Sequence, residues 1–187
     1  MATTQDIRNG LCIEMNGDLL SVVEFLHVKP GKGAAFVRTK LKSYKTGKTI
    51  EHTFTAGARI ETARIERRPY TFLYKADGVH NFMHAETYEQ ITIEEEIINA
   101  PHLLKEGQNV EIIVHADTET PLSCELPAFV EMEITYTEPG VRGNTATNAM
   151  KDATIETGAN IRVPLFVETG EVIRIDTRTS EYSERVR

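Results

Sequence analysis

The chain has 187 residues, of which 40% are hydrophobic and 7% aromatic, with no tryptophan and a formal net charge of −7. This length fits one domain or two or three small ones, and the low aromatic content argues against a single large core. No apolar run approaches the roughly 20 residues of a membrane-spanning helix and the N-terminus lacks a secretory signal, so we expect a cytoplasmic protein with no membrane partner.

The charge is unevenly distributed along the chain. Residues 1–64 carry 10 basic and 6 acidic side chains, residues 65–128 carry 4 and 12, and residues 129–187 carry 7 and 10. Between Glu24 and Glu51 there is no acidic residue, but there are seven basic ones. Because solvated charged faces usually mix both signs, this stretch favours a face that binds a polyanion such as RNA.

Strand patterns dominate the first third of the chain and predict a small SH3-like (KOW-like) barrel. Residues 19–28, 34–41 and 50–55 alternate between apolar and polar side chains, as half-buried strands do. Turn residues separate these runs: Thr46-Gly47-Lys48 lies between the last two, and a second turn lies between the first two.

That second turn, Lys29-Pro30-Gly31-Lys32-Gly33, predicts a tight hairpin tip that holds Lys32 in solvent. Pro30 sets φ near −65°, and both Gly31 and Gly33 accept a positive φ. A hairpin tip needs only Gly, Asn or Asp, so a lysine gains no stability there. The pattern therefore indicates a functional tip with a chemically modifiable amine.

The middle third predicts a five-stranded barrel of the OB type. A hairpin with strands 70–75 and 79–84 turns at Asp77-Gly78, and a strand follows at 88–93. We expect a short helix over residues 94–104, with Glu94, Glu95 and Glu96 at its N-terminus, and two further strands at 110–115 and 122–126. Aromatic side chains are frequent here and are expected to pack in the core: Tyr70, Phe72, Tyr74, Phe82 and Tyr88.

The last third predicts a second OB-type barrel. Strands are expected at 129–136, 154–156, 161–163, 172–176 and 181–186, around a long polar loop at 138–152. Joints near Arg64 and Ala128 give an all-β chain with domains at 1–64, 65–128 and 129–187.

No catalytic or metal-binding set is evident. His80 and His84 fall in a strand pattern without nearby cysteine or acidic partners, so we expect ordinary strand residues. Cys12 and Cys124 each lie in an apolar segment and are expected to be reduced core residues. We therefore predict no catalytic residue, no metal and no cofactor.

Two motifs resemble bacterial elongation factor P, and the similarity extends over the whole chain. The first is Lys29-Pro30-Gly31-Lys32-Gly33-Ala34-Ala35-Phe36-Val37-Arg38, which resembles the family's loop with a modified lysine. The second is Lys151-x-Ala153-x4-Gly158-x2-Ile161-x-Val163-Pro164-x2-Val167-x2-Gly170, which fits the family's C-terminal motif at every fixed position.

The resemblance implies an L-shaped protein of tRNA-like outline, with an SH3-like domain followed by two OB domains. It further implies a monomeric factor that binds the ribosome between the peptidyl-tRNA and exit sites and relieves stalling at consecutive prolines. Lys32 would extend toward the CCA end of the peptidyl-tRNA and orient the reactants, and the factor itself would not be an enzyme.

The resemblance also implies which residues contact RNA. Those in the first domain lie along the acceptor arm of the tRNA, and those in the third lie near the exit-site codon and in the C-terminal tail. The predicted contacts are Lys29, Arg38, Lys40, Lys42, Gly143, Asn144, Thr145, Tyr182 and Arg185. Asn144 replaces the family's usual aspartate, which keeps an acceptor but loses the charge.

Modification is implied at Lys32. Within the family the tip carries β-lysine or an aminopentanol group on lysine, or a sugar on arginine, and some members work unmodified. Lys32 excludes only the arginine chemistry, so a Lys32-modifying enzyme is an expected partner.

Two alternatives stay open from the sequence. One is the elongation-factor-P-like paralogue, whose tip usually departs from Pro-Gly-Lys-Gly. The other is an OB-type single-strand RNA chaperone, which would need exposed aromatic side chains on an OB face.

Overall fold

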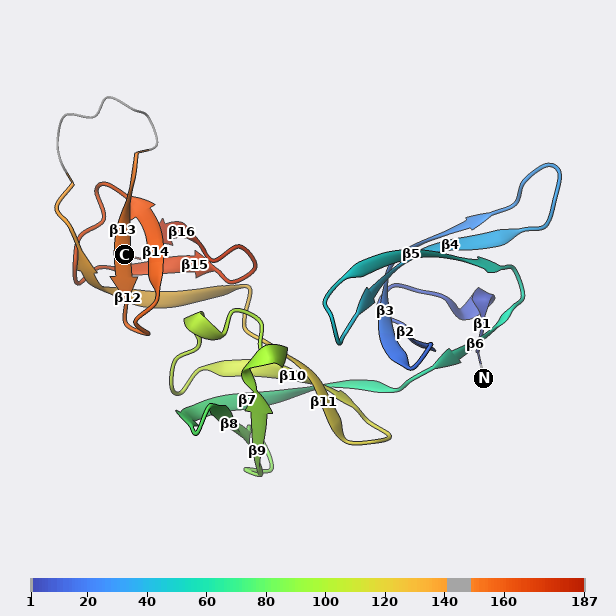
Figure 1. Cartoon of the computed structure of the whole chain (residues 1–187), viewed down its shortest axis with the longest axis horizontal. Coiled ribbons are helices and arrows are strands. Elements are labelled where there is room, and N and C mark those ends of the chain that lie inside the picture. Colours follow the sequence, from blue (N-terminus) through green and yellow to red (C-terminus); the bar gives the residue numbers. More distant parts are fainter. Residues whose placement is uncertain (1, 141–148, 187) are drawn as a thin grey trace. The chain divides into compact units, whose positions relative to one another are not determined.

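The computed structural model describes residues 2–140 and 149–186 and is nearly all β (Figure 1). The strands form one six-stranded and two five-stranded sheets. The only helical segments in these two ranges are three single turns of 3₁₀ helix. No helix in the described residues is long and apolar enough to cross a membrane. The predicted all-β chain is confirmed.

Contacts divide the chain into two compact units. One contains the residues up to Arg67 together with Ile113–Ser123, and the other contains Arg68–Ile112 together with the residues from Cys124 onward. The three domain ranges expected from the sequence stay a prediction.

The first sheet has the strand order β1-β6-β2-β3-β4-β5, and its neighbouring strands pair antiparallel. Its core contains Ile13, Leu20, Val22, Val37 and Leu41. The 3₁₀ turn η1 (Thr4–Asp6) follows β1, capped by Thr3. The strands are β1 (Ala2–Thr3), β2 (Cys12–Met15), β3 (Asp18–Val28), β4 (Phe36–Ser43), β5 (Thr49–Thr55) and β6 (Arg59–Thr62).

The β2–β3 hairpin was not predicted. Its two-residue turn is Asn16-Gly17, with φ of +55° and +74°, as a type I′ turn requires. Asn-Gly between two apolar runs is a strong hairpin signal, so the sequence did contain the information. The predicted turn at Thr46-Gly47-Lys48 is confirmed, because Gly47 N–H donates to Ser43 O at 2.9 Å.

The middle sheet has the strand order β11-β10-β7-β8-β9. The predicted turn at Asp77-Gly78 is confirmed: φ is +52° and +83°, and Ala76 pairs directly with Val79. Its strands are β7 (Ile65–Ala76), β8 (Val79–His84), β9 (Gln90–Glu94), β10 (Asn109–His115) and β11 (Thr120–Glu125).

The prediction of a helix over residues 94–104 is wrong. The segment forms two 3₁₀ turns, η2 (Glu95–Ile97) and η3 (Pro101–Leu103). Ala100 between them has φ +48° and ψ +55°, which breaks a right-handed helix, and Pro101 has no N–H to continue one. Glu94 makes no side-chain cap, and Glu95 instead pairs with Lys75.

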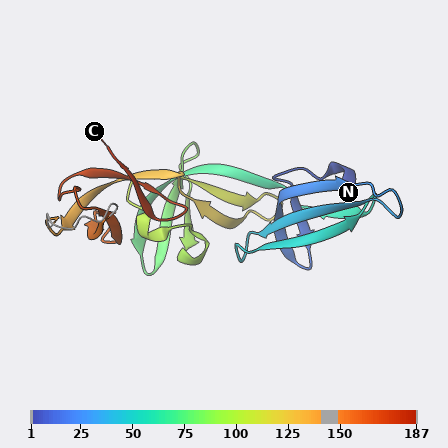
Figure 2. The same ribbon diagram turned by 90° about the horizontal axis from the view of Figure 1, so that it is seen from above.

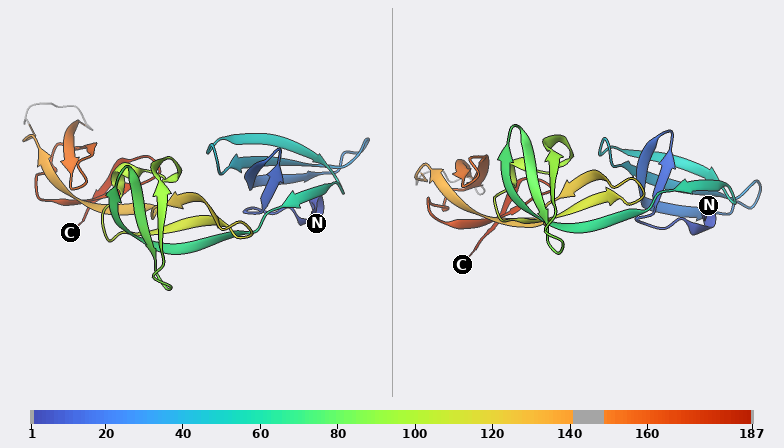
Figure 3. Two further views of the ribbon diagram at one scale, coloured as in Figure 1. Left: turned by 60° about the horizontal axis from the view of Figure 1, so that its bottom comes forward. Right: turned by 90° about the horizontal axis from the view of Figure 1, so that it is seen from below.

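The C-terminal sheet has the strand order β14-β13-β12-β15-β16 and matches the five strands expected there. The predicted polar loop at 138–152 is too long, because β13 already begins at Met150. The strands are β12 (Phe129–Thr137), β13 (Met150–Ile155), β14 (Asn160–Pro164), β15 (Val172–Asp176) and β16 (Glu181–Arg185). Figure 3 shows the middle sheet, in green to yellow, and the C-terminal sheet, in orange to red.

Both cysteines are free and buried, as predicted. Burial raises the pKa of the Cys12 thiol to about 11 and that of the Cys124 thiol to about 12. Both are therefore neutral thiols that pack as small apolar side chains.

Candidate functional site

Lys32 lies in the connection between β3 and β4, at one end of the first sheet (Figure 2). Val28 and Phe36 form the last pair of the two strands, so residues 29–35 are a longer loop than the tight tip expected from the sequence. Lys32 is exposed, and it has no hydrogen bond or ion pair to any residue in the described part of the chain. Its ammonium is free to contact a partner.

The two glycines beside Lys32 differ, which the sequence did not predict. Gly33 has φ +107°, a conformation that side-chain-bearing residues rarely adopt, but Gly31 has no such positive φ. A Cβ added to Gly33 would lie 4.0 Å from Pro30 Cγ, so the need for glycine there is conformational and not steric.

The base of the loop is fixed by a third strand. Ala56 N–H, just after β5, donates to Ala35 O at 2.9 Å, and Thr55 pairs with Phe36. The β4 end of the loop is therefore bonded to β5, and the pair of Val28 with Phe36 closes the loop against β3.

Three predicted RNA contacts share the outer face of β4. Arg38, Lys40 and Lys42 alternate with the buried residues Val37, Thr39, Leu41 and Ser43, as the period of a strand requires. They project from one side of the sheet, which the sequence pattern anticipated.

Lys40 differs from its two neighbours because it is already paired. Its Nζ lies 2.7 Å from Glu24 Oε2, and Glu51 is its cross-strand partner on β5. The hydrogen bond and charge of Glu24 raise the pKa of Lys40. Arg38 and Lys42 have no ion pair among the described residues. The basic face therefore has two available cations with a neutralised one between them.

The other predicted RNA contacts lie in the C-terminal domain. Tyr182 and Arg185 on β16 line one open pocket of about 610 Å³, so the structure brings them together. Arg185 Nη1 is 2.9 Å from Glu171 Oε1, and its guanidinium lies 5.7 Å from the centre of the Phe166 ring. Arg185 is therefore not a free cation. Burial raises the pKa of Tyr182.

The sequence analysis did not predict Phe166 as part of this site. In the structure its side chain is 59% exposed and lies beside Arg185. An aromatic residue in the short turn after Pro164 is its only sequence signal. The predicted codon-contact residues Gly143, Asn144 and Thr145 lie outside the described residues.

Family models match all three parts of the chain. "Elongation factor P (EF-P) KOW-like domain" matches residues 3–60, "Elongation factor P (EF-P) OB domain" matches residues 65–123, and "Elongation factor P, C-terminal" matches residues 130–185. The chain belongs to the elongation factor P family.

Full-length relatives agree with this assignment. "Elongation factor P" of Amoebophilus asiaticus is 57% identical over 100% of this chain and 98% of its own, and that of Flavobacterium johnsoniae is 56% identical over 100% of both. "Elongation factor P 1" of Porphyromonas gingivalis is also 56% identical over 100% of both chains.

The fold is also found in solved structures. "Eukaryotic translation initiation factor 5A from Methanococcus jannaschii" matches with a TM-score of 0.52 and 20% identity, and covers 67% of this chain and 90% of its own. The predicted fold class, a KOW-like domain with OB domains, is confirmed for this member of the elongation factor P family.

The aromatic residues of the middle domain are only partly where we expected them. Tyr70, Phe72 and Phe82 are buried, but Tyr74 is 47% and Tyr88 is 70% exposed. A β-bulge between Phe72 and Tyr74 interrupts the alternation of faces, and Tyr88 lies in a turn with φ +62°.

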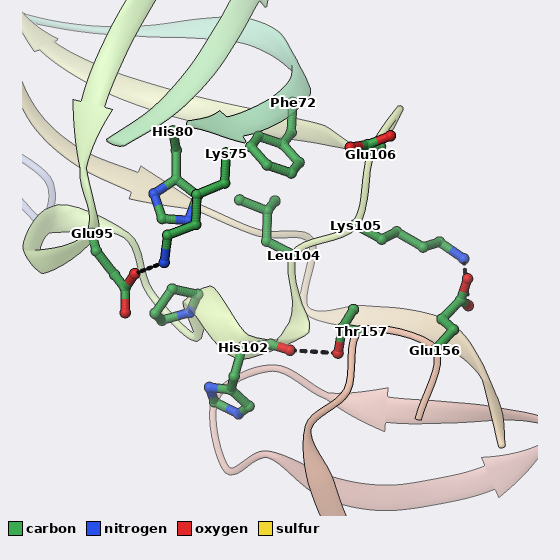
Figure 4. Close-up of a pocket in the computed structure, with 11 residues that line it drawn as sticks. Phe72, Lys75, His80, Glu95, His102, Leu104, Lys105, Glu106, Glu156 and Thr157 are labelled. Carbon is green, nitrogen blue, oxygen red and sulfur yellow. Dashed lines mark hydrogen bonds and ion pairs between the residues drawn. The ribbon is translucent and has the colours of Figure 1, made fainter. Parts of the chain in front are cut away.

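A pocket of about 750 Å³ lies beside η3, lined by residues of the middle domain and by Glu156 and Thr157 of the C-terminal domain (Figure 4). Phe72, His80 and Leu104 line its inner side, and an ion pair between Lys75 and Glu95 lies at its edge. His80 is buried on β8, and burial lowers its pKa, with a further effect of the nearby Lys75 charge. Both effects disfavour the charged form of the ring. No group of His, Cys, Asp and Glu suited to a metal occurs in ranges 2–140 and 149–186.

Proposed function

We propose that this chain is a translation elongation factor that binds the ribosome between the peptidyl-tRNA and exit sites. There it stimulates peptide-bond formation and relieves stalling at consecutive prolines. Membership of the elongation factor P family supports the general role. The observation that carries the specific role is Lys32, exposed and without a partner among the described residues, on a loop whose base is held by three strands.

The physical task fits a positioning factor and not an enzyme. Proline is a hindered secondary amine with a fixed φ, so the two reactants meet in poor geometry during peptidyl transfer. A cation held against the CCA end of the peptidyl-tRNA restricts that end to orientations from which attack succeeds. The ribosome performs the reaction, and the factor supplies orientation.

The outer face of β4 is the proposed contact with the phosphate backbone of the peptidyl-tRNA and of rRNA. Arg38 and Lys42 have cationic groups there without an ion pair among residues 2–140 and 149–186, and Lys29 adds another after the end of β3. Lys40 contributes less, because binding a phosphate would compete with its pair to Glu24. These contacts position the tip without reading sequence.

The C-terminal domain is the proposed second contact, near the exit-site codon. Tyr182 and Arg185 line its open pocket. Gly143, Asn144 and Thr145 are the further contacts that the resemblance implies. Arg185 must exchange its pair with Glu171 to bind a phosphate.

Lys32 is also the proposed site of covalent modification by a dedicated enzyme. An exposed primary amine with no competing partner in the described part of the chain is accessible to such an enzyme, and a longer group would extend its reach. The proposal requires no metal or cofactor, and it places a monomeric factor in the cytoplasm, where translation occurs.

The test is synthesis of a reporter with three consecutive prolines in a purified translation system without endogenous factor. We expect rescue by the wild-type protein and none by Lys32→Ala. The matched control is Lys45→Ala, which removes an exposed lysine from the β4–β5 connection of the same sheet and should rescue normally. Equal rescue by both variants would refute the role of the tip.

A single-strand RNA chaperone is the second candidate, and the exposed Tyr74 and Tyr88 are the observation in its favour. Residues 65–128, which contain both, carry 12 acidic and only 4 basic side chains, which opposes RNA binding. A chaperone would melt an RNA hairpin without ribosomes, whereas the proposed factor would not.

A further inference from the structure

The linker between the middle and C-terminal domains is hydrogen-bonded on both sides. Leu126 N–H donates to Asn99 Oδ1 of the middle domain at 2.6 Å. Thr177 of the C-terminal domain, which is buried, donates its hydroxyl to Pro127 O at 2.7 Å and its N–H to Ala128 O at 3.0 Å. A linker whose backbone groups are bonded to both neighbours has little freedom to bend.

The segment Asn99–Lys105, here called the clamp segment, makes further contacts with the C-terminal domain (Figure 4). Thr157 Oγ1, in the β13–β14 turn, donates to the carbonyl of His102 at 2.7 Å. His102 Nε2 also lies 3.0 Å from Ser180 Oγ, in the β15–β16 turn. The clamp segment therefore contacts two separate turns of the C-terminal sheet.

Lys105 adds the third point and reaches the central strand β12. Its Nζ donates to Glu131 O at 2.9 Å and lies 3.0 Å from Glu156 Oε1. The same Glu156 oxygen accepts the N–H of Glu133 at 3.1 Å, so β12 holds the carboxylate in place for the lysine. Hydrogen bonds to charged groups are about twice as strong as neutral ones.

A second lysine of the same pocket provides an internal comparison. Lys75 and Lys105 both line the pocket, their side chains are 50% and 40% exposed, and each is paired with a glutamate. The partner of Lys75 is Glu95, within the middle domain, whereas both partners of Lys105 belong to the C-terminal domain. Of these two lysine–glutamate pairs, only that of Lys105 joins the two OB domains.

We propose that Lys105 is a positioning residue that fixes the orientation of the C-terminal domain to the middle domain. This rests on the proposed function, in which the factor binds the ribosome through both its first and its C-terminal domain. Two contacts on one molecule strengthen each other more when their spacing is fixed before binding, because less conformational freedom is then lost on binding. A loosened joint would lower affinity for the ribosome without changing the action of the tip.

The first test measures the joint directly and needs no ribosome. Spin labels are placed on cysteines introduced at the exposed positions Ala85 and Ser183, in a background where both native cysteines are replaced by alanine. Distances between the labels are then compared for wild type, Lys105→Met and Lys75→Met by double electron–electron resonance. We expect a narrow distribution for wild type and Lys75→Met, and a broader one for Lys105→Met.

The second test separates positioning from a general loss of structure. In the three-proline assay, Lys105→Met should raise the half-saturating factor concentration about fivefold and leave the saturating rate unchanged. Lys32→Ala should abolish the saturating rate, and Lys105→Arg, which keeps the charge, should retain most of the affinity. A variant that merely unfolds would also lose melting temperature.

An unchanged distance distribution in Lys105→Met would overturn the proposal, as would equal broadening in Lys75→Met. A lower saturating rate at unchanged half-saturating concentration would also overturn it. If wild type fails to rescue, the proposed function fails, and the distance measurement still decides whether Lys105 holds the joint.

Discussion

The loop glycines allow a prediction from one matched pair of substitutions. Gly33→Ala forces alanine into φ +107°, which costs about 1–3 kcal/mol for a non-glycine residue. Gly31→Ala meets no such strain, and no atom beyond its two chain neighbours lies within 4 Å of the added Cβ. Because alanine also restricts the unfolded chain, Gly31→Ala should leave stability unchanged or raise it by about 0.4–1 kcal/mol.

Thermal unfolding and the three-proline assay together check this reasoning. For a chain of this size each kcal/mol shifts Tm by about 2–4 °C, so Gly33→Ala should melt a few degrees lower unless the loop relaxes. Both the strain at residue 33 and a relaxation of the loop that relieves it would disturb the placement of Lys32. Rescue should therefore fall by about tenfold or more, since small misplacements of a positioning group are costly. Gly31→Ala should rescue like wild type. Equal losses for the two variants, or full rescue by Gly33→Ala, would refute the argument.

Three further predictions concern charges and thiols. Lys42→Met should weaken co-sedimentation with ribosomes and reduce its salt slope by about one, whereas Lys40→Met should do so less, because Lys40 is already paired. Hydrogen bonds from the Arg178 side chain and N–H lower the pKa of Asp176 from its ordinary 3.8 to about 2. The charged carboxylate therefore stabilises the folded protein above about pH 4, and this stabilisation is lost as the pH falls toward 2. Urea midpoints of wild type and Asp176→Asn should differ at pH 7 and converge at pH 2. The Cys124 thiol, with its pKa raised to about 12, should react with a disulfide reagent at pH 8 only after unfolding in guanidinium.

Strands were predictable where side-chain alternation and turn chemistry agreed. The hairpin at Asp77-Gly78 combines both signals, and its register is the one a two-residue turn imposes. The hairpin at Asn16-Gly17 carries the same turn signal, but its first strand, Cys12–Met15, is too short for alternation to be evident. The all-β class depended only on such local patterns.

The features that the sequence did not predict depend on irregular backbone. The bulge between Phe72 and Tyr74 exposes a tyrosine that strict alternation would bury. In the first sheet, the pairing shift between Val22 and Glu24 places that glutamate opposite Lys40. A one-residue change of register moves side chains to the other face, and the sequence pattern does not mark where it occurs.

The positions of the candidate site residues were therefore predictable from the sequence, but the ion pairs that some of them form were not. Lys32 follows from local turn chemistry, and the face shared by Arg38 and Lys42 follows from alternation. The pair between Arg185 and Glu171 joins a strand to a distant turn, which only the folded chain brings together.

The strand order of the first sheet has a consequence for the sequence of folding events during synthesis. The pairs β2–β3, β3–β4 and β4–β5 join neighbours along the chain, so little loop entropy is lost in forming them. Both β1 and β2 pair with β6, which ends at Thr62, so the sheet cannot be completed until that residue has been made. Since chains fold from the N-terminus as they emerge, the hairpin that carries Lys32 can pair with β5 once the residues up to Thr55 have left the ribosome.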